Sequence, residues 1–78
     1  MTAAEYLHQL HETRSKRLQE LCATFGSMRE AAREIGCYTP SYLTRLCRGI
    51  DPFNERIARN IEHTFGLEFG ALDRAKEN

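Results

Sequence analysis

Several residue types that define other protein classes are scarce or missing in this chain. It contains no valine and no tryptophan, and no stretch alternates apolar and polar residues for long enough to indicate a strand. The longest stretch without a charged side chain, residues 35–44, has ten residues and contains Pro40. A membrane-spanning helix needs roughly 20 apolar residues. These absences exclude a β-rich fold and a membrane-spanning helix and predict an all-α protein.

The cysteines and the N-terminus indicate the compartment. The three cysteines are odd in number and lie 15 and 10 residues apart, without a C-x-x-C motif. This pattern argues against a disulfide framework, and Cys22 and Cys47 are expected on apolar helix faces. The N-terminus lacks the basic start and apolar run of a secretory signal, so we expect a cytoplasmic protein.

The length and the charge distribution describe one small domain with a basic centre. A chain of 78 residues with 41% apolar and 28% charged residues fits a single globular domain. Although the formal net charge is zero, residues 14–59 carry nine basic and five acidic side chains. Both flanks are acidic, and a basic region of this kind is a potential binding surface for an acidic partner.

Capping residues divide the chain into helical segments with short connections. We expect helices at 3–25, with continuity near Thr13 left open, and at 28–35, 40–48, 54–65 and 69–75. Helix ends are predicted at Gly26, Gly36, Gly49 and Gly66. Thr2 and Ser27 begin capping boxes, Thr39 precedes Pro40, and Asp51 competes with Asn54 as the cap of the fourth helix.

The third segment has two opposed faces. Leu43, Leu46, Cys47 and Ile50 form an apolar stripe, and Ser41, Thr44, Arg45 and Arg48 lie about 200° away from it. The polar face carries hydroxyl and guanidinium groups without a carboxylate, which suits contacts to base edges and phosphates. The preceding helix has a small-residue face and ends at Gly36, so residues 27–49 match the pattern of a helix-turn-helix.

The sequences Ser27-Met-Arg-Glu-Ala-Ala-Arg-Glu-Ile-Gly36 and Thr39-Pro-Ser-Tyr-Leu-Thr-Arg-Leu-Cys-Arg-Gly49 resemble the lambda-repressor-like family of phage and bacterial regulators. Residues 54–73 are similar to the fourth and fifth helices of that family, so the resemblance covers roughly residues 14–73. It implies a compact five-helix domain with a helix-turn-helix at 27–49, C-terminal helices at 54–75 and an N-terminal helical extension at 1–13. The chain departs from the family pattern by one extra residue between Gly36 and Leu43.

The resemblance also implies a function and its residues. It implies a cytoplasmic, nucleoid-associated bacterial repressor of phage or mobile-element type that binds an inverted-repeat operator in duplex DNA as a homodimer. The candidate base readers are Ser41, Tyr42, Thr44 and Arg45, and the candidate phosphate contacts are Arg14, Arg17, Arg29, Thr39, Arg48 and Asn54. The candidate dimer interface comprises Leu67, Phe69 and Leu72.

Other interpretations of these residues stay open. The first-helix arginines and Arg29 are also typical of a solvated face, Tyr42 of a ring packed on the first helix, and Leu72 of a core residue. His8 and His11 lack the further ligands of a zinc site, and no nucleophile with a base can be assembled. We therefore expect no metal, no cofactor, no small-molecule substrate and no enzymatic activity. The alternative function is an antitoxin-like or adaptor module that binds another protein through the same helices.

Overall fold

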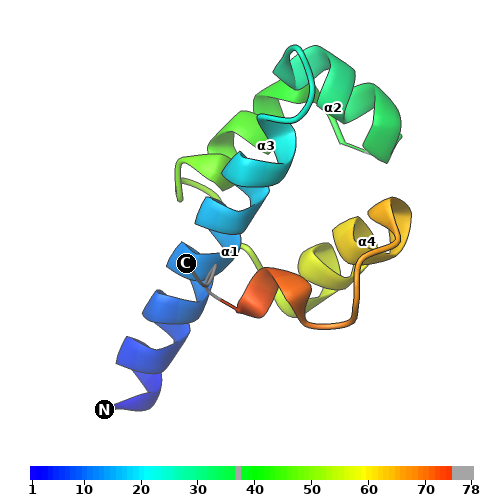
Figure 1. The fold of residues 1–78 in the computed structure, drawn as a ribbon. Coiled ribbons are helices and arrows are strands. Elements are labelled where there is room, and N and C mark those ends of the chain that lie inside the picture. The colour runs from blue at the N-terminus through cyan, green and yellow to red at the C-terminus, as the bar shows by residue number, and fades with distance from the viewer. Residues whose placement is uncertain (37, 75–78) are drawn as a thin grey trace.

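Four α-helices and one 3₁₀ turn make up the part of the chain that the computed structural model describes, residues 1–36 and 38–74. The elements are α1 (Ala3–Cys22), α2 (Met28–Ile35), α3 (Pro40–Cys47), α4 (Glu55–Phe65) and the 3₁₀ turn η1 (Ala71–Asp73). Figure 1 shows α2 and α3 beside the C-terminal part of α1, with α4 and η1 below α2 and to the right of α1. No strand is present among these residues, which confirms the all-α prediction.

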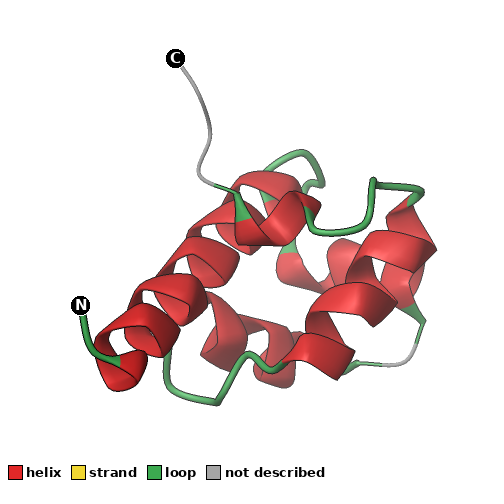
Figure 2. Cartoon of the chain, turned by 90° about the horizontal axis from the view of Figure 1, so that it is seen from below, coloured by secondary structure: helices red, strands yellow, loops and turns green. Residues whose placement is uncertain are grey.

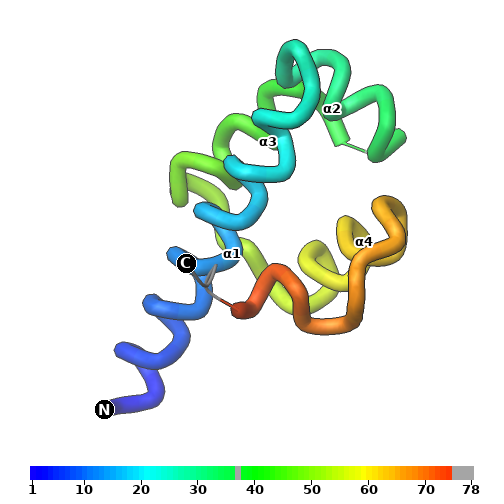
Figure 3. The backbone as a smooth tube through the Cα atoms, viewed as in Figure 1, coloured from blue at the N-terminus to red at the C-terminus, as the bar shows by residue number. Residues whose placement is uncertain are grey.

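Helix α1 resolves the question left open at Thr13 and ends earlier than predicted. It continues through Thr13, whose hydroxyl donates to the carbonyl of Gln9 at 2.9 Å. It ends at Cys22, and Ala23 in the right-handed region closes it, so the expected helix end at Gly26 is wrong. The first turns of α1 extend away from the remaining helices (Figure 3).

The predicted N-cap residues cap their helices, and the structure decides between Asp51 and Asn54 at α4. Side chains of Thr2, Ser27 and Thr39 each accept a hydrogen bond from the backbone N–H three residues later. Asn54, not Asp51, caps α4 by accepting from the N–H of Ile57 at 2.9 Å. Gly36 ends α2 at a φ of 83°, a left-handed conformation that a residue with a Cβ adopts at a cost.

One hydrophobic core joins all five elements. Its buried apolar residues are Leu18, Cys22, Ala31, Ala32, Ile35, Leu43, Leu46, Cys47, Phe53, Ala58, Ile61 and Leu72. The alanine pair of α2 supplies the small face on which neighbouring helices pack closely. Figure 2 shows the helices arranged about a common centre and connected by short loops. Phe53, which lies in the loop before α4, is the core residue that helical periodicity did not predict.

The C-terminal segment folds as a single 3₁₀ turn where a helix at 69–75 was expected, and residue 75 lies outside the described residues. The buried carboxylate of Glu62 accepts hydrogen bonds from the N–H groups of Gly70 at 2.9 Å and Leu72 at 2.8 Å. These contacts satisfy N–H groups at the start of the turn, which have no acceptor within a helix. The turn is therefore held against α4 by a side chain of α4.

Candidate nucleic-acid interface

Helix α3 separates its two faces as the periodicity predicts. Leu43, Leu46 and Cys47 are buried, whereas Ser41, Arg45 and Arg48 are exposed and Thr44 is half-buried. A hydrogen bond joins α3 to α1, because the Ser15 hydroxyl of α1 donates to the carbonyl of Leu46 at 2.7 Å. The polar face of α3 is thus displayed on a helix whose position the core and α1 determine.

Ile50 does not continue the apolar stripe of α3. The helix ends at Cys47, and Gly49 takes a φ of 73°, which turns the chain away from the helical path. Ile50 donates its N–H to the carbonyl of Arg45 at 2.9 Å, and its side chain is 62% exposed. The expectation that Ile50 packs is wrong because a left-handed glycine precedes it.

Arg45 and Tyr42 lie in a chain of contacts on the exposed side of α3. Arg45 Nε donates to Asp51 Oδ2 at 2.8 Å, and the guanidinium lies 5.6 Å from the ring centroid of Tyr42. The rings of Tyr42 and Tyr38 are 5.3 Å apart with a tilt of 45°. Burial raises the pKa of the Tyr42 hydroxyl, and the charges of Tyr38 and Asp51 add to this effect. Tyr42 therefore packs on Tyr38 and Arg45.

The hydroxyl groups of Thr39 and Thr44 each retain one hydrogen-bonding function. Thr39 Oγ1 accepts from the N–H of Tyr42 at 3.1 Å, so its hydroxyl proton is available to a phosphate oxygen. Thr44 Oγ1 donates to the carbonyl of Pro40 at 2.9 Å, so its lone pairs can accept from a base amino group. Asn54 uses Oδ1 as the cap of α4, which leaves its amide N–H groups as donors.

Four exposed arginines have no ion-pair partner among the described residues. Arg29 and Arg48 are exposed, and within residues 1–36 and 38–74 neither forms an ion pair. The same holds for Arg33 and Arg56, which sequence analysis counted in the basic centre but did not assign to a site. A guanidinium without an acidic neighbour keeps its full charge for a phosphate.

Arg14 lies in the interior, so its assignment to phosphate contact is wrong for this structure. It is 2% exposed and donates to Asp73 Oδ1 at 2.6 Å, the Phe53 carbonyl at 2.7 Å and Glu55 Oε2 at 3.0 Å. Burial alone would raise the pKa of Asp73, but hydrogen bonds from Arg14 and Arg59 hold the pKa of that carboxyl below its ordinary value. Arg14 is therefore a structural cation that connects α1 with α4 and η1.

Arg17 also lies away from the polar face of α3. It pairs with Glu20 at 2.9 Å and borders a groove with Leu21, Leu67 and Leu72. Helix α3 contacts α1 through Ser15 and Gln19 instead, and Gln19 lies about 160° from Arg17 around the helix. The structure thus does not bring Arg17 together with Arg45 and Arg48.

The three residues expected at a dimer interface divide between core and surface. Leu72 is 2% exposed and belongs to the core, so its assignment to the interface is wrong. Phe69 is 78% exposed, and the guanidinium of Arg59 lies 4.5 Å from its ring centroid. Leu67 is exposed at the border of the groove near Arg17. Of the three expected interface residues, Leu67 and Phe69 are therefore the exposed ones.

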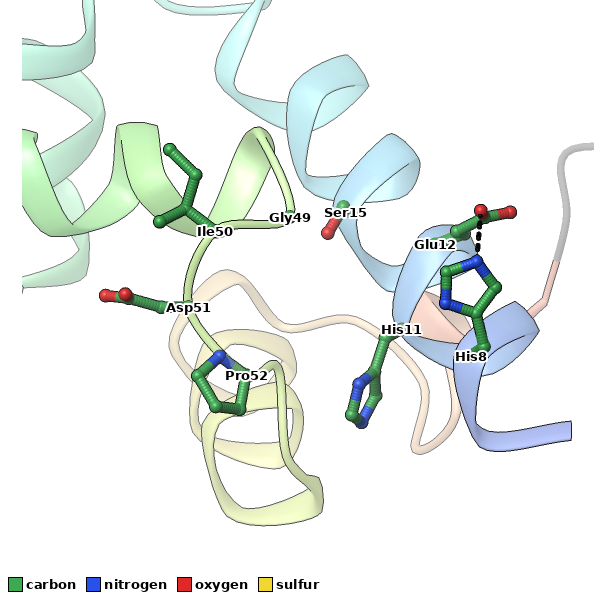
Figure 4. A pocket seen from close by; sticks show the side chains of 8 residues that line it. All are labelled: His8, His11, Glu12, Ser15, Gly49, Ile50, Asp51 and Pro52. Carbon is green, nitrogen blue, oxygen red and sulfur yellow. Dashed lines mark ion pairs between the residues drawn. The ribbon is translucent and has the colours of Figure 1, made fainter. Parts of the chain in front are cut away.

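A shallow groove of about 360 Å³ separates the first half of α1 from the loop between α3 and α4. Its lining includes His8, His11, Glu12, Ile50 and Asp51, and His8 pairs with Glu12 at 2.9 Å (Figure 4). The described residues contain no group of three histidine, cysteine or acidic side chains arranged to hold a metal ion. Among the same residues, no helix combines the length and apolar character needed to cross a membrane.

The chain matches no protein-family model, no curated protein sequence and no solved structure. Assignment of a function therefore depends on the residues and contacts described above.

Proposed function

We propose that this protein binds duplex DNA sequence-specifically, with α2 and α3 acting as a helix-turn-helix and α3 entering the major groove. The observation that carries the proposal is the polar face of α3, which presents Ser41, Arg45 and Arg48 opposite a fully buried stripe. An α-helix fits the major groove, which is about 12 Å wide, and its exposed side chains then reach base edges.

The groups on this surface divide into base readers and phosphate contacts. Arg45 has two terminal nitrogens suited to guanine O6 and N7, and Ser41, Tyr42 and Thr44 lie on the same helix beside it. We assign phosphate contact to four exposed residues, Arg29, Thr39, Arg48 and Asn54. Arg14 and Arg17 take no part in this assignment.

A homodimer extends the proposal to an inverted-repeat operator. Two copies related by a two-fold axis place their third helices one helical turn of DNA apart, about 34 Å. The exposed Leu67 and Phe69 supply apolar surface for such a contact. A dimer of this kind would act as a transcriptional repressor by occluding a promoter.

The test is selection of duplexes from a random library at near-physiological salt, followed by sequencing of the retained DNA. We expect the native protein to enrich an inverted repeat and Arg45→Ala to lose that enrichment. Arg74→Ala is the matched control, because Arg74 is exposed and pairs only with Glu68 among the described residues. Retention of no DNA by the native protein would overturn the proposal.

A protein-interaction module is the second candidate, and exposed apolar side chains on α1 favour it. Tyr6 and Leu7 are 57% and 50% exposed on the part of α1 that extends from the body. A protein of this class would bind its partner with little dependence on salt. It would be indifferent to Arg45→Ala but sensitive to Tyr6→Ala or Phe69→Ala.

A further inference from the structure

We propose that Asp51 is a positioning residue for base recognition, whose carboxylate holds Arg45 so that the terminal guanidinium nitrogens face a guanine. This inference rests on the proposed function and adds a specificity-determining residue to it. Asp51 lies in the loop after α3, outside the helix that carries the base readers.

The contact between the two side chains leaves one edge of the guanidinium free. Arg45 Nε donates to Asp51 Oδ2 at 2.8 Å, and no hydrogen bond from the terminal nitrogens of Arg45 is formed within the described residues. The two terminal N–H₂ groups are the ones that form a bidentate contact with guanine O6 and N7. The carboxylate therefore occupies the Nε–H of Arg45 and leaves the two terminal N–H₂ groups available.

An aromatic ring restrains the same guanidinium from a second direction. Arg45 lies 5.6 Å from the ring centroid of Tyr42, and Tyr42 is itself packed against Tyr38 at 5.3 Å. A cation over a ring is attracted by the electron-rich face, which limits rotation of the guanidinium. With both restraints, Arg45 loses less rotamer freedom on binding than an unrestrained arginine.

Among the described residues that line the groove bordered by Asp51, no other cation contacts its carboxylate. His8 and His11 belong to the same groove, but the carboxylate of Asp51 points away from His11 (Figure 4). His8 is paired with Glu12 at 2.9 Å. Arg45 is thus the cation that the carboxylate of Asp51 contacts.

The pairing also predicts how Arg45 and Arg48 differ. The charge of Asp51 offsets that of Arg45 and weakens its attraction to phosphates, which are present at every sequence. Arg48, three residues later, has no acidic partner among the described residues and keeps that attraction. Asp51 therefore decreases non-specific binding while it favours the one base that accepts both nitrogens of Arg45.

The test measures the affinity of native protein and Asp51→Ala for the selected duplex, for its single-base-pair variants and for random duplex. The native protein should prefer guanine at the position that Arg45→Ala makes indifferent. Asp51→Ala should lose about tenfold of that preference. Its binding to random duplex should tighten, with a salt slope steeper by about one.

Three further variants keep the outcome interpretable. Asp51→Asn preserves size and hydrogen bonding without charge and should lose part of the preference. In an Arg45→Ala background, Asp51→Ala should change the preference no further. Glu34→Ala removes an exposed acid of α2 and should leave base preference intact.

Retention of the native guanine preference by Asp51→Ala, or equal loss of preference at every position, would overturn the inference while leaving DNA binding established. Absence of any DNA binding by the native protein would instead overturn the proposed function.

Discussion

Arg14 of α1 and Asp73 of η1 are 59 positions apart in sequence and joined by a hydrogen bond of 2.6 Å between Nε and Oδ1. Arg59 reaches the same carboxylate oxygen at 2.8 Å, so two cations share one acid. This cluster connects the first helix, the fourth helix and the C-terminal turn, which also buries Leu72 in the core. Charge thus adds to hydrophobic burial in holding the C-terminal segment.

Removal of one member of this cluster should be costly. Arg14→Met keeps the apolar stem but leaves the Phe53 carbonyl without its donor and Asp73 with Arg59 as its remaining cation. We expect a decrease of about 3–5 kcal/mol in the free energy of unfolding, measured by urea denaturation. Arg17→Met is the control, since Arg17 pairs only with the exposed Glu20 in the described part of the chain, and should cost less than about 1 kcal/mol. Equal effects of the two substitutions would contradict the structural role of Arg14.

The cluster also predicts an acid dependence of stability. The pKa of Asp73 is lower in the folded state than its ordinary value of 3.8. Its contribution is therefore complete above that value and is lost as the pH falls through the folded pKa. Thermal melts are measured from roughly pH 6 down to roughly pH 2. At the higher pH, Asp73→Asn should be less stable than the native protein, and its melting temperature should decrease less as the pH falls. A parallel decline of both proteins would show that Asp73 does not contribute.

The buried thiols of Cys22 and Cys47 should be unreactive in the folded protein. Both are free and lie in the core, and a hydrogen bond to Cys22 together with burial raises the pKa of the Cys47 thiol. In a Cys37→Ser background, alkylation followed by mass spectrometry should modify both residues only as fast as the protein opens. Rapid alkylation without denaturant would mean that this part of the core is accessible.

Phosphate contacts should be distinguishable by salt. Arg48→Ala should weaken binding to all duplexes and make the salt slope shallower by about one. Arg17→Ala should leave both quantities unchanged, because its side chain borders the groove with Leu67 and Leu72. Fluorescence anisotropy across a salt series measures both, and a larger effect for Arg17 would place the DNA on the opposite side of α1.

Self-association should depend on the exposed aromatic side chain of Phe69. Phe69→Asp introduces a charge where the side chain is 78% exposed, so the fold should tolerate it. Sedimentation velocity should then show a shift from dimer to monomer. A native protein that is monomeric both free and on DNA would exclude the proposed dimer.

The sequence predicted those features that depend on local patterns. Caps at Thr2, Ser27 and Thr39 and the buried stripe of Leu43, Leu46 and Cys47 follow from side-chain chemistry and helical period, and the structure confirms them. The partners of Arg14 were not predictable, because Asp73 is brought to it only by the tertiary fold.

The end of α3 illustrates the same limit at the candidate site. In the sequence, Asp51 competes with Asn54 as a helix cap, since its position before Pro52 fits that role. Only the turn at Gly49 brings its carboxylate to Arg45. A signal was present in the sequence as an acid close to a basic helix face, but its pairing depends on loop geometry.

The most direct test of DNA binding by α3 is an NMR titration of ¹⁵N-labelled protein with a random-sequence duplex at low salt. Backbone amide chemical shifts are measured at each addition of DNA. We expect shifts and line broadening to concentrate in α2, α3 and the loop to Asn54, with little change in residues 3–13. Such a map would locate the DNA on the polar face of α3 before any operator is known. An unchanged spectrum at saturating DNA, or changes confined to the first half of α1 and to residues 67–74, would contradict it.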